Sequence, residues 1–176
     1  FAIRDYKNIC NYIHLPAQSG NTRILKKMNR TYTRDWYDEK VARIKEVIPE
    51  CAISTDIITG FCSETDPEHQ DTVNLMKKVR YELAYMFFYS ERPGTLAQKK
   101  FEDDVPEVTK KARLKEIIDI QTQINKELNE AEIGETYEVL VEGVSKRDKN
   151  DLRGRNSQNK VIIFPQESFK LGDFVK

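Results

Sequence analysis

The sequence predicts an α/β domain followed by a small all-β unit. Two observations support this fold class. Between residues 11 and 129, short apolar runs rich in β-branched residues alternate with longer segments of helical period, which is the order of a βα barrel or a doubly wound sheet. From Gly134 onward the apolar residues follow the period of strands. We therefore expect one domain over residues 1–133 and a second over residues 134–176.

The first domain is expected to contain three units that each begin with a strand. Three runs rich in β-branched or aromatic residues are the expected strands: residues 11–15, 52–59 and 83–89. Four segments with apolar residues three and four positions apart are the expected helices: residues 21–29, 33–48, 66–79 and 106–129. Thr33 or Asp35 can cap the second helix, and Asp66 with Pro67 opens the third.

The second domain is expected to be all β. Its apolar residues predict three strands: residues 137–141, 160–164 and 171–175. A polar segment from Ser145 to Lys160 separates the first two strands. Phe169 and Phe174 are spaced as strand residues, and we expect them to pack in the core rather than to stack on bases.

Composition narrows the classes of function. The 29 basic and 29 acidic side chains cancel, so a contact with nucleic acid must come from a local patch. Residues 145–160 form such a patch, because six cations face only two carboxylates there: Lys146, Arg147, Lys149, Arg153, Arg155 and Lys160 against Asp148 and Asp151. The three cysteines are widely spaced, which argues against a disulfide framework and favours a reducing compartment. The sequence contains no apolar run of about 18 residues, so it predicts no membrane span.

Four motifs follow one another along the chain. They read His-Leu-Pro-Ala-Gln-Ser-Gly from His14, Met-Asn-Arg from Met28, Thr-Asp-Ile-Ile-Thr-Gly-Phe from Thr55 and Tyr-Ser-Glu-Arg-Pro-Gly-Thr from Tyr89. In this order they resemble the second half of a radical S-adenosylmethionine (SAM) barrel, most closely that of the MiaB-type tRNA methylthiotransferases. The resemblance implies the C-terminal half of a partial (βα)6 radical SAM barrel, followed by a small, OB-like TRAM barrel that is truncated at its C-terminus.

The resemblance also assigns a SAM site. Gln18 matches a family glutamine that contacts the ribose, and Arg30 matches the arginine that meets the methionine carboxylate. Asp56 matches the acidic residue that accepts hydrogen bonds from the ribose hydroxyls. Each residue alone has a simpler interpretation: a glutamine bonded to backbone, a solvated arginine, and an aspartate buried beside an arginine. Their shared ligand and their order favour the site.

An RNA-binding surface is implied as well. Arg92, in the turn after the last strand of the first domain, is the candidate for positioning a phosphate. In the second domain Arg153-Gly154-Arg155-Asn156, with Asn159-Lys160-Val161, resembles part of the TRAM motif, so Lys146, Arg147, Arg153, Arg155 and Lys160 are expected to contact RNA. The alternative is a turn at Arg92 and a solvated hairpin loop in the second domain.

Three further residues have a bland expected role. Cys62 lies in Phe61-Cys62-Ser63-Glu64-Thr65, which stands where the family commonly has Phe-Pro-Gly-Glu-Thr, and we expect it to be a small, semi-buried hydrophobic residue. His14 is expected to pack at the end of a strand, although an acid or base role is open. His69 is expected at the surface.

The function that the resemblance implies is insertion of a methylthio group at C2 of N6-isopentenyladenosine beside the tRNA anticodon. Its cofactors would be SAM and two 4Fe-4S clusters, and its partners the anticodon stem-loop and a reductant such as flavodoxin or ferredoxin, in the cytoplasm. Cys10, Cys51 and Cys62 lack the spacing of cluster ligands, so we expect those ligands outside this chain, with no catalytic residue and no metal ligand within it. The chain alone should then be inactive.

Two other functions stay open. A sister enzyme of the same superfamily would modify threonylcarbamoyladenosine in tRNA or a ribosomal protein. A non-catalytic RNA-binding protein would use a degenerate barrel only to support its β unit. An unrelated βα enzyme is disfavoured by the ordered motifs.

Overall fold

The computed structural model describes all 176 residues, and they form two compact units. The first, which we call the β unit, comprises residues 1–13, 45–52 and 132–176. The second, which we call the α/β unit, comprises residues 14–44 and 53–131. No helix is both long and apolar enough to cross a membrane.

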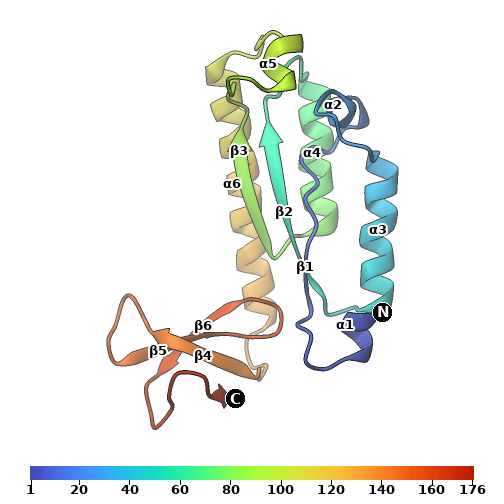
Figure 1. Cartoon of the computed structure of the whole chain (residues 1–176). Coiled ribbons are helices and arrows are strands. Elements are labelled where there is room, and N and C mark those ends of the chain that lie inside the picture. Colours follow the sequence, from blue (N-terminus) through green and yellow to red (C-terminus); the bar gives the residue numbers. More distant parts are fainter. The chain divides into compact units, whose positions relative to one another are not determined.

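Three strands form one sheet, in the order β1 (Tyr12–His14), β2 (Ala52–Thr59) and β3 (Leu83–Phe88) (Figure 1). β2 and β3 are parallel, with Ser54 opposite Leu83 and Thr59 opposite Phe88. Parallel strands require a crossover connection, and α4 (Asp66–Val79) provides it. All three strands were predicted from the sequence, and β2 has the predicted limits.

Helices cover one face of this sheet. α3 (Arg34–Val47), α4 and the long α6 (Glu107–Ala131) run alongside it in Figure 1, while α2 (Thr22–Lys27) and α5 (Leu96–Lys100) lie near the carboxyl ends of β2 and β3. Val41 from α3, Val73 from α4 and Ile117 from α6 meet Ile57 from β2 in one buried core. This packing is what the periodicity of the predicted helices indicated. The short α5 was not predicted.

The opposite face of the sheet is free of these helices. Along β2 the residues alternate, so that Ile57 is buried while Asp56 and Ile58 are only partly buried. On β3 the same alternation leaves Tyr85 and Phe87 exposed, by 48% and 56%. This uncovered face carries one predicted site residue, Asp56.

Capping residues fix the starts of the helices. The Asn21 side chain accepts hydrogen bonds from the first turn of α2, and Thr33 Oγ1 accepts from the backbone N–H of Trp36 in α3. α4 begins with a capping box in which Thr65, rather than the predicted Asp66, is the N-cap and Glu68 bonds back to it. Asp66 is the first residue inside the helix, where a carboxylate is favoured by the helix dipole.

The β unit contains a four-stranded antiparallel sheet in the order β6–β5–β4–β7. The strands are β4 (Val139–Val144), β5 (Asp151–Arg155), β6 (Val161–Pro165) and β7 (Phe174–Val175), and α1 (Ala2–Asp5) belongs to the same unit. Val139, Val141, Leu152 and Val175 form its core. Phe169 packs against this core, as expected, whereas Phe174 is 68% exposed and the core prediction was wrong for it.

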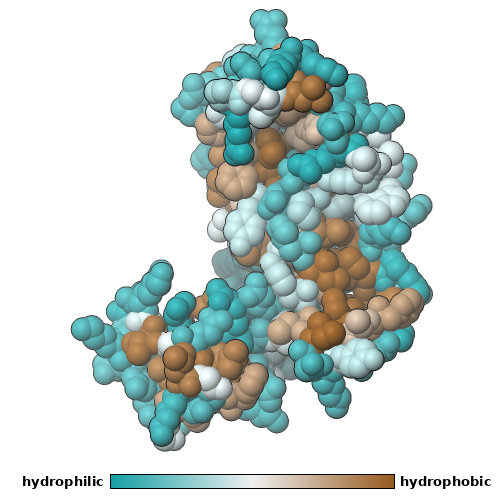
Figure 2. Space-filling model, viewed as in Figure 1, coloured by the Kyte–Doolittle hydropathy of each residue, from teal (hydrophilic) through white to brown (hydrophobic).

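β5 was not among the predicted strands. It alternates correctly, because Leu152 and Gly154 point to the buried face while Arg153 and Arg155 lie on the other. A Cβ at position 154 would overlap the Leu140 carbonyl oxygen, so only glycine allows β4 and β5 to approach this closely. The exposed face of the sheet therefore combines arginines with apolar residues of β6, and Figure 2 shows hydrophobic side chains gathered on this unit.

A candidate SAM and RNA site

Gln18 lies directly beside β2. Its backbone N–H donates to the Asp56 carbonyl oxygen at 2.8 Å, and its carbonyl accepts from Ile58 N–H at 2.9 Å, so it extends the sheet by one residue. Its φ is +65°, a left-handed conformation that a glutamine rarely adopts and that costs about 1 kcal/mol or more. The residue is only 6% exposed, and its side chain makes no hydrogen bond within the protein. A strained backbone here holds an amide that is free to bond a ligand.

Asp56 lies on β2, next to Gln18, and its side chain is on the uncovered face of the sheet. Its Oδ1 is 3.6 Å from His14 Nε2, and the His14 ring is fixed from its other side by a 2.7 Å hydrogen bond between Nδ1 and Ser54 Oγ. Tyr85 lies edge-on to the same ring. The side chain of Asp56 is about one third exposed, which leaves carboxylate oxygen available to a ligand. His14 is packed at the strand end, as predicted.

Arg30 is placed by the end of α2. Asn29 has φ +60°, and the N–H groups of Asn29 and Arg30 donate to the carbonyl oxygens of Lys26 and Leu25. This is a Schellman motif, in which asparagine replaces the usual glycine. The guanidinium of Arg30 makes no ion pair within the protein and is exposed. The backbone of Arg30 is thus fixed, while its guanidinium is available to a ligand.

A cavity of about 480 Å³ opens beside these residues in the α/β unit. Arg30 and Arg92 line it together with the partly exposed Ile58. Because Ile58 and Asp56 lie on the same face of β2, the carboxylate is on the face where the cavity opens. Its wall is aromatic: Phe61, Phe87, Phe88 and Tyr89. Neither Gln18 nor Asp56 lines this cavity, so the structure brings Arg30 and Arg92 together and keeps the Gln18–Asp56 pair apart from them.

The loop after β2 is held by a buried ion pair. Gly60 N–H donates to Glu64 Oε2 at 2.6 Å, and Arg113 from α6 donates through Nη1 to the same oxygen at 2.9 Å and through Nη2 to Asp66 at 2.7 Å. The Glu64 side chain is fully buried, and burial raises the pKa of its carboxyl group. Glu64 Oε1 and Arg113 Nε have no partner. The pair fixes the position of Phe61, which forms part of the cavity wall.

Lys110 supports the same wall from α6. It is 4% exposed, forms an ion pair with Asp103, and places its ammonium 5.2 Å from the centre of the Tyr89 ring. Burial raises the pKa of Tyr89 to about 12. Sequence reasoning missed Lys110, Arg113 and Glu64. The available signal was the pair of cations three residues apart on the α6 face that also carries Ile117 and Gln121.

Cys62 and His69 are both buried. Cys62 packs with Ile24, Phe61 and Tyr89, and burial raises the pKa of its thiol, as expected for a small hydrophobic residue. The prediction of a surface position for His69 was wrong: it is 5% exposed, because α6 packs on α4 and brings Glu116 Oε2 to 2.9 Å from His69 Nε2. The structure gathers no three His, Cys, Asp or Glu side chains that could hold a metal ion.

Carboxylates partly neutralise the basic patch of the β unit. Arg155 donates to both oxygens of Glu142, at 2.7 and 3.0 Å, and Lys160 donates to both oxygens of Glu132 at 2.7 Å. Lys146, Arg147, Lys149 and Arg153 have no carboxylate partner. Counting Glu132 and Glu142 with Asp148 and Asp151, six cations face four carboxylates, so the local excess falls from four charges to two.

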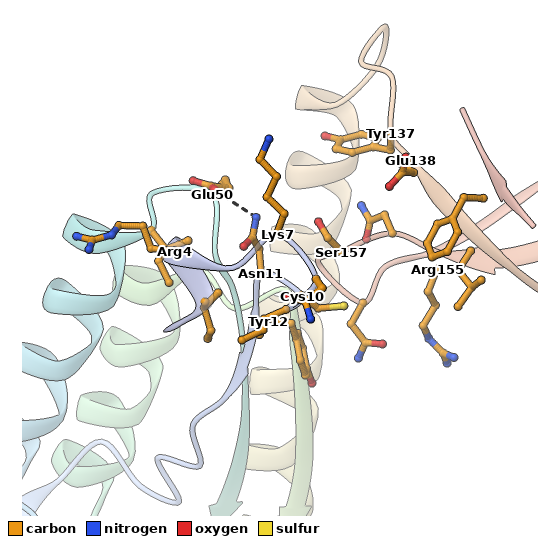
Figure 3. A pocket seen from close by; sticks show the side chains of 18 of the residues that line it. Arg4, Lys7, Cys10, Asn11, Tyr12, Glu50, Tyr137, Glu138, Arg155 and Ser157 are labelled. Carbon is orange, nitrogen blue, oxygen red and sulfur yellow. Dashed lines mark hydrogen bonds between the residues drawn. The ribbon is translucent and has the colours of Figure 1, made fainter. Parts of the chain in front are cut away.

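The β unit also contains a hollow of about 990 Å³. Figure 3 shows side chains of the N-terminal segment, including Lys7 and Tyr12, on one side and Tyr137 with Arg155 on another; the dashed line is the 3.2 Å hydrogen bond from Asn11 to Glu50. Arg155 is the one predicted RNA-binding residue that lines it. None of the predicted SAM-binding residues does.

Comparison with protein families places both parts of the chain. Residues 2–76 match the radical SAM superfamily and residues 130–176 match the TRAM domain. Among solved structures, coproporphyrinogen III oxidase from Escherichia coli, described as a radical SAM enzyme, superposes with a TM-score of 0.55 over 65% of this chain and 27% of that one. At 22% identity this likeness concerns the fold.

Curated relatives match nearly the whole chain. The tRNA-2-methylthio-N(6)-dimethylallyladenosine synthases of Amoebophilus asiaticus and Phocaeicola vulgatus are 54% and 53% identical to it, over 99% and 98% of its residues. The chain spans 36% and 38% of their lengths. The chain is therefore similar to the C-terminal part of these tRNA methylthiotransferases, with a radical SAM segment followed by a TRAM domain.

Proposed function

We propose that this chain is the part of a tRNA methylthiotransferase that binds one side of SAM and grips the tRNA, and that the whole enzyme modifies N6-isopentenyladenosine next to the anticodon. Residues 1–133 would supply the C-terminal half of the barrel and residues 134–176 the TRAM domain. The names of the relatives and the two domain matches support this proposal.

The strained backbone of Gln18, with an amide that bonds no other group of the protein, is the observation that carries the SAM site. The left-handed backbone costs about 1 kcal/mol or more. A ligand with hydroxyl groups offsets it, because an amide both donates and accepts. Asp56, hydrogen-bonded to Gln18 through the backbone, offers acceptors to the same hydroxyls.

The remaining groups fit the rest of SAM. Arg30 presents a free guanidinium, a planar fork suited to a carboxylate, at the edge of an aromatic cavity of about 480 Å³. SAM, together with a reduced iron–sulfur cluster, supplies the radical and methyl chemistry of this superfamily. We place the ligands of both 4Fe-4S clusters outside this chain, expect flavodoxin or ferredoxin as reductant, and infer from the tRNA substrate that the enzyme works in the cytoplasm.

The TRAM domain would hold the tRNA through phosphate contacts. Its free cations, Lys146, Arg147 and Arg153, are the main candidates, and Arg155 and Lys160 would have to exchange their carboxylate partners for phosphate. Arg92, at the cavity, would contact the RNA nearer to the reacting base.

SAM binding to the full-length enzyme tests the site. Asp56→Asn and Arg30→Ala should each weaken SAM binding, measured by calorimetry, by roughly ten- to a hundred-fold, because each removes a charge-assisted hydrogen bond worth about 1.5–3 kcal/mol. Their affinity for tRNA should stay within two-fold. The matched controls are Asp119→Asn and Arg80→Ala, at exposed positions paired with Lys115 and Glu127, and they should leave SAM affinity unchanged. Unchanged SAM affinity in Asp56→Asn would show that the ribose assignment is wrong.

Nucleoside mass spectrometry tests the reaction. The full-length protein is reconstituted anaerobically with iron and sulfide, and then incubated with SAM, reductant and prenylated tRNA. A methylthio adduct on isopentenyladenosine is expected. Cleavage of SAM without that adduct would move the substrate to threonylcarbamoyladenosine or a ribosomal protein. Absence of both would favour a non-catalytic RNA-binding protein.

A further inference from the structure

We propose that the α/β unit carries an RNA-binding surface of its own, separate from the TRAM domain, formed by exposed cations of α2 and α5 around the cavity. We call it the α2–α5 rim and define it by Lys26 and Lys27 of α2, Lys99 and Lys100 of α5, and Arg92 of the turn before α5. Its partner would be the phosphate backbone of the substrate RNA, so this inference rests on the proposed function.

The charges of the rim are not neutralised within the protein. Lys26, Arg92, Lys99 and Lys100 are exposed and make no ion pair. The lysines of α6 behave differently: Lys111, Lys115 and Lys126 each pair with a carboxylate one turn away, on Glu107, Asp119 and Glu130. Lysines paired with carboxylates one turn away are ordinary on a helix. The cations of the rim have no such pair, so their charge is available to a phosphate.

Few carboxylates lie near the rim. Asp103 is already bound to Lys110, which leaves Glu91, Glu102 and Asp104 in the segments that carry the rim. Asp104 accepts a hydrogen bond from Ser63 N–H. Five cations against three carboxylates leave a local excess of two, equal to the excess that remains on the TRAM patch.

Both rim helices are anchored to one structural platform. Met28 of the α2 end and Ala97 of α5 pack on the same buried cluster of Ile24, Phe61, Cys62 and Tyr89. Lys27 joins the two segments, because its ammonium lies 4.7 Å above the Phe101 ring and donates to Ser63 Oγ at 2.5 Å. Figure 2 shows hydrophilic side chains around hydrophobic ones near α5. The two helices that carry the cations therefore meet at one cavity.

The arrangement fits RNA better than a small anion. Lys27 and Arg92 of the rim line the cavity, whereas Lys26, Lys99 and Lys100 do not, so most of the charge of the rim lies outside the cavity. A small anion would need only the inner cations. A chain of phosphates can contact the outer ones while a base approaches the aromatic wall of Phe87 and Tyr89, and each phosphate contact releases counterions.

The test compares two triple variants of the full-length enzyme. In the rim variant, Lys26, Lys99 and Lys100 are all changed to Gln; in the control variant, Lys111, Lys115 and Lys126 are changed to Gln, which removes the same charge from α6. Affinity for an anticodon stem-loop RNA is measured between 50 and 200 mM salt. The rim variant should lose roughly ten-fold or more in affinity at low salt, and its salt slope should become shallower by about 2 to 3. The control should stay within two-fold.

SAM affinity shows that the variants are folded, because none of the six changed residues belongs to the SAM site. If the rim triple fails this check, Lys99→Gln with Lys100→Gln alone is the replacement, with an expected loss of slope of about 1 to 2. Binding equal to the control, with the parent enzyme still binding RNA and forming product, would overturn the rim while leaving the proposed function intact. A parent that binds no RNA would overturn both.

Discussion

Replacing Arg113 with leucine should loosen the loop that carries Phe61. The Glu64 side chain is fully buried and receives hydrogen bonds from only two groups, Arg113 Nη1 and Gly60 N–H. Without the guanidinium, a carboxylate with one donor remains in an apolar site, and breaking such a pair costs about 3–5 kcal/mol. Protonation of Glu64 limits this cost. Neutralising a carboxyl with an ordinary pKa of 4.5 at pH 7 takes 2.5 units, or about 3 kcal/mol.

Because protonation of Glu64 limits the loss of stability in Arg113→Leu, that loss depends on pH. In the variant, burial without a counter-ion keeps the folded-state pKa of Glu64 above its unfolded value, so the folded state binds the extra proton. Stability should therefore rise as pH falls from about 7.5 toward 5, opposite to an ordinary carboxylate pair. At pH 5 the same protonation takes only about 0.7 kcal/mol.

Hydrogen exchange of residues 57–66 in the full-length protein, corrected for the intrinsic pH dependence of exchange, is the assay. It reports opening of this loop and does not require the whole protein to unfold in one step. Glu64→Gln on the Arg113→Leu background removes the buried charge and should recover most of the loss without pH dependence. Lys111→Leu is the control, because that lysine is 62% exposed and its pair is worth less than about 0.5 kcal/mol. A loss under about 1 kcal/mol, or one that is the same at both pH values, would refute the reasoning.

Two further predictions concern the same end of the α/β unit. Gly60→Ala should lower SAM affinity and stability more than Gly94→Ala. Both positions have positive φ, but only at Gly60 would a Cβ overlap Lys110. SAM binding and thermal unfolding of the two variants check this, and equal losses would contradict it. Hydrogen bonds from Arg23 lower the pKa of Glu68 to about 2, so the stability from this pair should be present above pH 4.5 and lost as pH falls toward 2. Since Arg23 is half exposed, about 2 kcal/mol is expected; acid titrations of the parent and Glu68→Gln measure it, and identical curves would contradict it.

The elements that the sequence predicted are those with a strong period of their own. β2 buries Ile53 and Ile57 and ends at a glycine, and α6 repeats its apolar residues from Leu114 to Ile124, so local pattern and tertiary packing agree. β5 has one large apolar residue, Leu152, among polar ones. It is a strand because β4 and β6 pair with it on both sides, which a local pattern does not reveal.

The site was predictable in part, for a similar reason. Motif order singled out Gln18, Arg30 and Asp56, and the structure joins Gln18 to Asp56 by one backbone hydrogen bond. Their assignment to SAM stays a prediction. The buried partners of the adjoining loop, Glu64 and Arg113, are 49 residues apart, and only the packing of α6 on α4 brings them together. The prediction that His69 lies at the surface was wrong for the same reason, because α6 packs on α4 and buries it.

The left-handed backbone of Gln18 implies a conflict between the stability of the folded protein and its ability to bind the ligand. Glycine adopts φ +65° without strain, so Gln18→Gly should make the folded enzyme more robust by about 1 kcal/mol while deleting the amide that we assign to the ligand. Selection for heat tolerance alone would favour that glycine, and selection for catalysis would remove it. A search for stabilising substitutions that also abolish activity is therefore a way to find ligand-binding residues in this family without any ligand in hand.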